Sequence, residues 1–222
     1  MVLFICAVAL ANAQSKINLP LKHELDSMYV LDQHYRELVS IKLDSNKVDS
    51  LTKLYKVDKK NLSTRLMTIQ TEVDSSNIKR VEAIVKRYGY PGRSLVGTPT
   101  NEAVFYVIQH STLIDKYLSL IEQAAIKKEL PFHLYAMMKD RSLMYNKKEQ
   151  IWGTQGRGQS ILNKAAGKNE FKFFIWPIAD PANVNKRRKE AGFEKTVEEN
   201  AEGLDIRYKV YTLEQALKGQ ID

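Results

Sequence analysis

The chain has 222 residues, of which 44% are hydrophobic and 27% are charged, and its formal net charge is +8. This composition fits a single globular domain with a sizeable core. It excludes a wholly disordered chain, a collagen-like chain and a membrane-embedded chain.

The first residues have the pattern of a secretory signal peptide. Residues 1–13, MVLFICAVALANA, are apolar and uncharged, and they end in the small-residue pattern of Ala11-Asn12-Ala13. We therefore expect a signal peptide over 1–13, a single domain over 14–222, and export to the periplasm or the exterior. The only cysteine, Cys6, lies within the signal, so the mature chain would have no disulfide or thiol chemistry.

The pattern of charge and hydropathy bears on the partners of an exported protein. No later apolar run reaches the ~20 residues of a membrane helix. Outside the cytosol, basic clusters meet anionic glycans, lipid headgroups and envelope surfaces rather than nucleic acid. The alternative is a solvated basic surface that has no partner.

The first half of the chain is predicted to be helical. Apolar residues at helical spacing predict an amphipathic helix over 16–40 and a polar, weakly anchored helix over 44–74. Ser75-Ser76 has the character of a helix cap, and Gly89 that of a helix stop. These signals predict a separate helix from Ser76 to Tyr88.

Three closely spaced helices are predicted next, and then the period changes. Helical spacing and capping residues favour helices over 100–111, 113–128 and 131–146. Short aromatic and apolar runs over 150–154 and 171–178 indicate two strands, joined by a flexible glycine-rich loop.

The last part of the chain is predicted to hold two helices and an edge strand. Asp180-Pro181 begins a helix that carries the basic run 186–189, residues 205–211 alternate like a strand, and 213–217 form a final helical turn. The predicted fold is α+β and mainly α-helical, with a small antiparallel sheet of about two to three strands in the C-terminal third.

Two polar residues interrupt apolar helix faces. His110 follows Ala103, Tyr106 and Val107 on one face, and Asp140 interrupts another apolar stripe. A buried carboxylate needs a partner. Either His110 or a backbone amide in a loop can fill that role for Asp140.

Familiar metal and cofactor motifs are not completed. His23-Glu24 begins an H-E-x-x-H pattern, but Ser27 occupies the second ligand position. The glycine-rich stretches near residues 153 and 167 match neither nucleotide-binding fingerprint. We therefore expect no cofactor and no metal ligands.

Short motifs in a fixed order resemble a bacterial family called domain of unknown function 6624, over about residues 25–195. The motifs are Asp32-Gln33-x-x-Arg36, Tyr88-Gly89-Tyr90-Pro91-Gly92, Gln109-His110-Ser111, Asp140-Arg141, Gln150-x-Trp152-Gly153-Thr154-Gln155, Pro177-Ile178 and Val184-Asn185-Lys186-Arg187-Arg188. The resemblance implies no reaction. It selects a set of polar residues: Gln109, His110, Asp140, Arg141, Gln150, Thr154 and Gln155.

Two interpretations of this set stay open. In one, the residues form a closed hydrogen-bond network that fixes the packing of the helices on the hairpin. In the other they line a pocket, with His110 as general acid or base and Asp140 orienting it as the catalytic pair. The ligand-binding residues would then be Gln109, Arg141, Gln150, Thr154 and Gln155.

These interpretations predict three functions. The first is an exported protein that binds a polar or anionic small molecule or glycan. The second is a hydrolase in which His110 and Asp140 activate water. The third is an envelope structural or interaction protein whose polar cluster is architectural.

Overall fold

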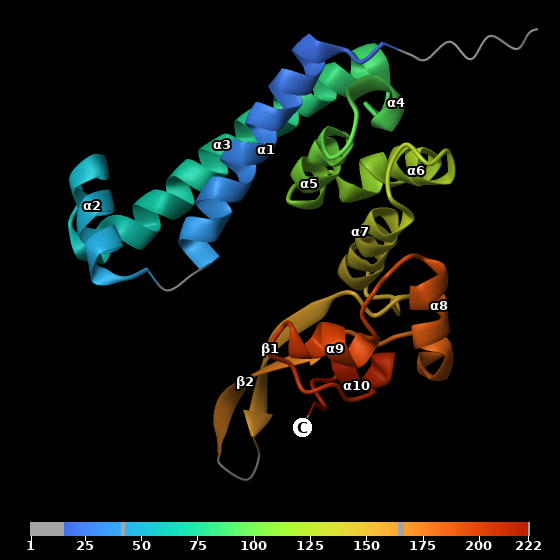
Figure 1. The fold of residues 1–222 in the computed structure, drawn as a ribbon. Coiled ribbons are helices and arrows are strands. Elements are labelled where there is room, and N and C mark those ends of the chain that lie inside the picture. Colours follow the sequence, from blue (N-terminus) through green and yellow to red (C-terminus); the bar gives the residue numbers. More distant parts are fainter. Residues whose placement is uncertain (1–15, 41–42, 164–166, 222) are drawn as a thin grey trace, which may run out of the picture.

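The computed structural model describes residues 16–40, 43–163 and 167–221, so the predicted signal peptide lies outside the described residues (Figure 1). The described residues form ten α-helices and a two-stranded antiparallel sheet near the C-terminus. The fold is therefore α+β and mainly α-helical, as predicted. Among these residues, no helix is both long and apolar enough to cross a membrane.

Two long antiparallel helices form the N-terminal part, α1 (Leu19–Ser40) and α3 (Lys59–Tyr88), with the short helix α2 (Ser45–Tyr55) at their far end (Figure 1). A small apolar cluster joins the three helices at that end. Its buried members are Leu38, Leu51, Leu62 and Leu66.

Helix α3 is continuous, and the separate helix predicted to begin at Ser76 is wrong. The hydroxyl of Ser75 donates a hydrogen bond to the carbonyl of Thr71, four residues earlier, instead of capping a new helix. Buried apolar residues continue on the same helix, with Ile69 before the serines and Val81 after them. The predicted stop at Gly89 is confirmed, with φ of +69°.

A central helical layer carries the main core. It contains α4 (Arg93–Val96), a 3₁₀ turn η1 (Thr100–Glu102), α5 (Ala103–Gln109), α6 (Ile114–Ile126) and α7 (Phe132–Tyr145). Helix α5 is almost wholly buried and packs against both α1 and α3. The three helices predicted over 100–146 are confirmed, each with shorter bounds. The first is shorter because residues 100–102 form a 3₁₀ turn.

The sheet consists of β1 (Gly156–Asn163) and β2 (Lys168–Ile175). The segment predicted as a flexible glycine-rich loop is therefore a strand. Its glycines leave room for neighbouring side chains: a Cβ at Gly158 would lie 2.5 Å from Phe171 Cε1, and one at Gly156 would lie 2.7 Å from Ile206 Cδ1. The strand predicted over 150–154 is wrong, and these residues form part of a loop described below.

The C-terminal part packs three short helices beside the sheet (Figure 1). After a 3₁₀ turn η2 (Pro181–Asn183) come α8 (Val184–Glu190), α9 (Val197–Glu202) and α10 (Leu213–Leu217). The edge strand predicted over 205–211 is wrong. Its buried Ile206 and Tyr211 belong to two different apolar clusters, which an irregular segment can serve without a partner strand.

Candidate functional site

Asp140 of α7 holds the loop of residues 150–155, which we call the 150–155 loop. The carboxylate is fully buried and accepts hydrogen bonds from the amides of Ile151, Trp152 and Thr154 at 2.7–3.2 Å. The hydroxyl of Thr154 adds a bond of 3.0 Å. In a β-strand these backbone amides would donate to a neighbouring strand. Here they donate to the Asp140 carboxylate, which explains why residues 150–154 do not form the predicted strand.

The carbonyl groups of the same loop are held from the opposite side. Arg187 Nε donates to the carbonyl of Ile151 at 3.0 Å, and Arg188 Nη1 donates to the carbonyl of Trp152 at 2.8 Å. Asn200 of α9 donates to the carbonyl of Gly153 at 3.1 Å. Part of the basic run 186–189 therefore turns inward and fixes the loop on α8 and α9.

Gln150 and Gln155 complete this network. Gln150 is fully buried; it donates to the carbonyls of Gln155 and Trp176 and accepts from the amide of Gln155. The side-chain amide of Gln155 donates to the Thr154 hydroxyl, at 2.9 Å. Around Asp140, Gln150 and Thr154 the geometry is that of the closed network, because each side chain is engaged by protein partners.

A second polar cluster lies where α1, α3 and α5 meet. We call Asp32, Arg36, Asp74 and His110 the Asp32 cluster. Arg36 donates two hydrogen bonds to Asp32, at 3.2 and 3.3 Å, and one to Asp74, at 2.5 Å. Gln33 donates to Asp32 at 2.7 Å. The D-Q-x-x-R element of the sequence is thus brought beside His110, 74 residues further along in the chain.

His110 contacts Asp32 and not Asp140. Its Nδ1 atom lies 3.3 Å from Asp32 Oδ2, although the N–H direction is not aligned for a full hydrogen bond. The expected pairing with Asp140 is not found, because the hydrogen bonds of that carboxylate go to the 150–155 loop. Of the two partners foreseen for Asp140, the loop amides are confirmed.

The His110 ring keeps one nitrogen available. The side chain is 18% exposed, Nδ1 is buried, and no hydrogen bond of the described residues involves Nε2. A neutral ring with its proton on Nδ1, beside Asp32, presents the Nε2 lone pair outward. This is the arrangement that a general base requires.

The two carboxyl groups of the Asp32 cluster differ in acidity. Burial alone would raise the pKa of Asp32, but contacts with His110 and Arg36 outweigh it, so that the pKa of Asp32 is lowered. Burial raises the pKa of Asp74, and its attraction to Arg36 does not fully offset this. Asp32 is therefore the carboxylate that stays charged next to the His110 ring.

Arg141 links the two networks. Its Nε atom donates to Gln155 Oε1 at 2.9 Å, and its Nη1 atom donates to the carbonyl of Gln109 at 3.0 Å. Gln109 thus contributes its backbone, and its carbonyl belongs to the peptide that leads into His110. Burial lowers the pKa of the Arg141 guanidinium, and the nearby charge of Arg36 adds to this.

Neither network, as described, is arranged as a metal centre. Within residues 16–40, 43–163 and 167–221, no group of three His, Cys, Asp or Glu side chains is arranged to hold a metal ion.

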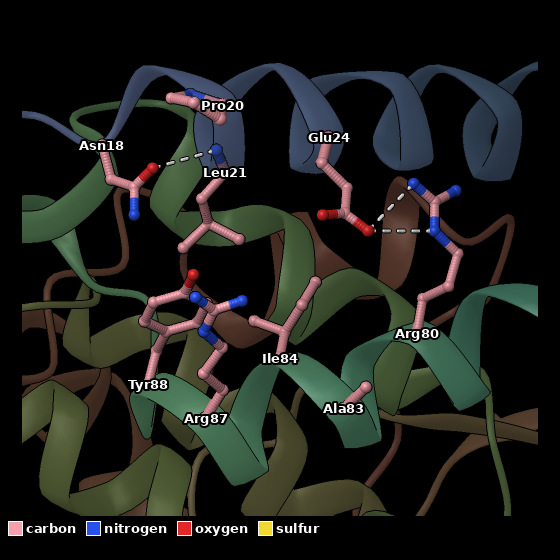
Figure 2. A pocket seen from close by; sticks show the side chains of 9 residues that line it. All are labelled: Asn18, Pro20, Leu21, Glu24, Arg80, Ala83, Ile84, Arg87 and Tyr88. Carbon is pink, nitrogen blue, oxygen red and sulfur yellow. Dashed lines mark hydrogen bonds and ion pairs between the residues drawn. The ribbon is translucent and has the colours of Figure 1, made fainter.

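Hollows of ligand size lie away from His110. One, of about 350 Å³, lies between α1 and α3, where Glu24 pairs with Arg80 at 3.1 Å (Figure 2). These two charged side chains thus neutralise each other. Another, of about 410 Å³, borders the 150–155 loop at Thr154 and Arg188.

Comparison with known proteins places the chain in a family. It matches the Family of unknown function (DUF6624) over residues 22–211, which is most of its length. The chain belongs to this family. No curated protein and no solved structure matches the chain. The DUF6624 match covers the Asp32 cluster, both arginines of α8 and the whole 150–155 loop.

Several residues of these sites were not among the candidate site residues chosen from the sequence. Asp32 and Arg36 carried a signal, because they form an i, i+4 pair within a recognised motif. Asp74 carried none, because it is one of many polar residues on its helix and its neighbour Arg36 comes from a distant segment. The inward orientation of Arg188 was hidden by its position in a run of four basic residues.

Proposed function

We propose that this DUF6624 protein is exported and binds the anionic group of a small molecule beside His110 and Arg141. Arg141 would supply the positive charge, and His110 a hydrogen bond. Asp32 would hold the His110 ring in place.

The observation that supports this proposal is that the Arg141 guanidinium has no carboxylate among its hydrogen-bond partners. Its guanidinium donates only to neutral oxygens, those of Gln155 and Gln109. Within the described residues Nη2 makes no hydrogen bond, and it is not fully buried. A cation held by neutral acceptors, with donor capacity left over, favours a carboxylate or a phosphate.

A nuclear magnetic resonance titration tests the binding. Inorganic phosphate and acetate are added at constant ionic strength while the ring resonances of the four histidines are followed. We expect the His110 resonances to shift with a Kd on the order of 1 mM, typical of a single small anion. The Arg141→Gln variant should abolish the shift, whereas His34→Gln, on the exposed side of α1, should leave it unchanged.

An unshifted His110 at saturating anion would contradict the proposal. It would favour the alternative in which the polar cluster is architectural and the protein acts through its basic surface. That alternative predicts a salt-sensitive interaction with anionic envelope components.

Hydrolysis is the second candidate function, and the contact between His110 Nδ1 and Asp32 favours it. Water would give a proton to Nε2 and attack an ester of the bound anion, and the leaving alkoxide would take that proton. With p-nitrophenyl acetate and p-nitrophenyl phosphate as probes, Asp32→Asn should lower turnover by about 10²–10⁴, as the loss of a ring-orienting carboxylate does. Turnover unaffected by Asp32→Asn or His110→Gln would exclude this mechanism.

Export rests on the composition of residues 1–13. Expression of the full chain with a C-terminal tag, followed by N-terminal sequencing of the periplasmic fraction, should find Gln14 as the first residue. An uncleaved chain in the cytoplasm would contradict this part of the proposal.

A further inference from the structure

The hollow at Thr154 and Arg188 lies between α7 and the segment that joins α8 to α9. We call it the Arg188 hollow. It is lined by His133, Met137, Thr154, Arg188, Phe193 and Lys195, among others. Its volume of about 410 Å³ falls within the range of small-molecule sites. It shares no lining residue with the Asp32 cluster.

Arg188 is a buried cation with no hydrogen-bonded counter-ion. The residue is 2% exposed, its Nε donates to the carbonyl of Lys195, and its Nη1 donates to the carbonyl of Trp152. The carboxylates whose charge reaches it are Asp140, Glu198 and Glu199. Asp140 is bonded to the 150–155 loop, Glu198 to Asn185 and Glu199 to Thr196.

One nitrogen of Arg188 remains for a ligand. No hydrogen bond of the described residues uses Nη2, and the atom is not among the buried polar atoms without a partner. The small exposed area of this side chain therefore includes Nη2. Arg188 lines the hollow, which makes its exposed Nη2 the donor available to a ligand there.

Two aromatic side chains line the hollow next to Arg188. The Arg188 guanidinium lies 4.6 Å from the centre of the Phe193 ring, and the His133 ring meets the same phenylalanine edge-on at 5.9 Å. Met137 adds a flexible apolar wall, and Lys195 adds a second positive charge. Glu194 also lines the hollow and places one negative charge there.

We propose that the Arg188 hollow is a binding site for a small aromatic anion, whose carboxylate or phosphate bonds Arg188 Nη2 while its ring packs on Met137, His133 and Phe193. This site is independent of the anion site proposed at Arg141. Among the residues that line the hollow, the two positive charges of Arg188 and Lys195 outnumber the single negative charge of Glu194. Asp140, Glu198 and Glu199 are already hydrogen-bonded elsewhere, so the free Arg188 donor favours an anion over a cation or a neutral ligand.

Titration of the full chain with four probes tests the site, with the His133 ring resonances and calorimetry as readouts. Benzoate and phenyl phosphate carry both groups, inorganic phosphate carries the charge alone, and benzyl alcohol carries the ring alone. We expect at least one aromatic anion to shift His133 and to bind at least tenfold more tightly than either single-group probe. Whichever of benzoate and phenyl phosphate binds more tightly shows whether the site prefers a carboxylate or a phosphate.

Variants separate the site from other basic surfaces. Phe193→Ala should weaken aromatic-anion binding at least fivefold, and Arg188→Lys should weaken it further by removing the forked donor. Lys189→Ala, an exposed change on the same helix, should have no effect. If Arg188→Lys fails to fold, Phe193→Ala still decides the matter, because its side chain is only half-buried at the hollow.

Three results would overturn the proposal. One is a His133 resonance that stays unshifted with both aromatic anions at about 10 mM, where a ligand with a Kd of about 1 mM would fill most sites. Another is equal binding by Phe193→Ala and the unaltered chain. The third is binding that Arg141→Gln abolishes while Phe193→Ala does not, which would assign the aromatic anion to the other site.

Discussion

Single buried carboxyl groups determine the local backbone conformation in this molecule, and Asp140 is the clearest case. Its oxygens accept three backbone amides and one hydroxyl, so one side chain organises a loop that would otherwise leave several buried donors unsatisfied. Burial raises the pKa of Asp140, while the amide bonds from Ile151, Thr154 and Trp152 lower it in part.

Asp140→Asn should therefore destabilise the fold. One acceptor oxygen becomes an NH₂ group that faces amide donors, so we expect the free energy of unfolding to fall by about 2–4 kcal/mol. Urea denaturation measures this. Asp205→Asn is the matched control, because that residue is exposed with φ of +57°, which asparagine adopts readily. A loss no larger than that of the control would contradict the structural role of Asp140.

Asp32 and Asp74 should respond to pH in opposite senses. The folded-state pKa of Asp32 is lowered, so its contribution to stability is present above the ordinary value of 3.8 and is lost as the pH falls through the folded pKa. The pKa of Asp74 is raised, so the fold gains from its protonated form, and that gain is lost as the pH rises through the folded pKa.

At pH 7, Asp32→Asn should lower the free energy of unfolding by about 1–3 kcal/mol, whereas Asp74→Asn should change it by less than about 0.5 kcal/mol. The deficit of Asp32→Asn should shrink as the pH drops below its ordinary value. Urea midpoints measured at pH 7, 5 and 3 check the trend. A deficit of Asp32→Asn that stays constant to pH 3 would show that folding does not lower the pKa of Asp32.

At the scale of elements, backbone conformation sets where helices end. Helix α3 ends at Gly89, whose φ of +69° and ψ of −153° lie in a region that only glycine adopts readily. The space around Gly89 is open, so a Cβ there meets no atom within 4 Å, and any cost of substitution comes from the backbone alone.

Gly89→Ala should thus lower the free energy of unfolding by about 1–2 kcal/mol. Gly203→Ala, at the end of α9, is the control: its φ is −63° and its Cβ would meet carbonyl oxygens at an ordinary 3.5 Å. Thermal unfolding of both variants compares them. Equal melting temperatures would mean that the α3 terminus rearranges without strain.

Across the whole molecule, the apolar core is unevenly distributed. Helix α5 has six buried residues, and five of them belong to the main apolar cluster, including the fully buried Val104, Phe105 and Ile108. Helix α2 has one buried residue, Leu51, and depends on a small cluster at the tip of the α1–α3 pair.

Native-state hydrogen exchange should show this difference directly. The amides of α5 should exchange only through global unfolding, while those of α2 should exchange through local opening at a much lower free energy. Leu51→Ala should speed exchange in α2 and leave α5 protection almost unchanged. Equal protection of the two helices would contradict this division of the core.

Sequence alone determined the fold class, the three helices over 100–146, the end of α3 and the family, because hydrophobic period, caps and motifs are local signals. The same signals failed over 150–163. There three amides of the 150–155 loop donate to Asp140, and Gly158 of β1 lies under aromatic rings of β2, so distant residues decide the conformation.

Tertiary structure alone decided which polar residues meet. The sequence left open whether Asp140 pairs with His110 or with loop amides; in the fold it bonds the loop amides, and the His110 ring contacts Asp32. Arg188, one of a run of four basic residues, is a buried cation beside a hollow. Spacing along one helix reports which face a side chain occupies. Which distant group satisfies that side chain depends on how the helices pack, because a buried charge takes the nearest partner that the assembled fold offers.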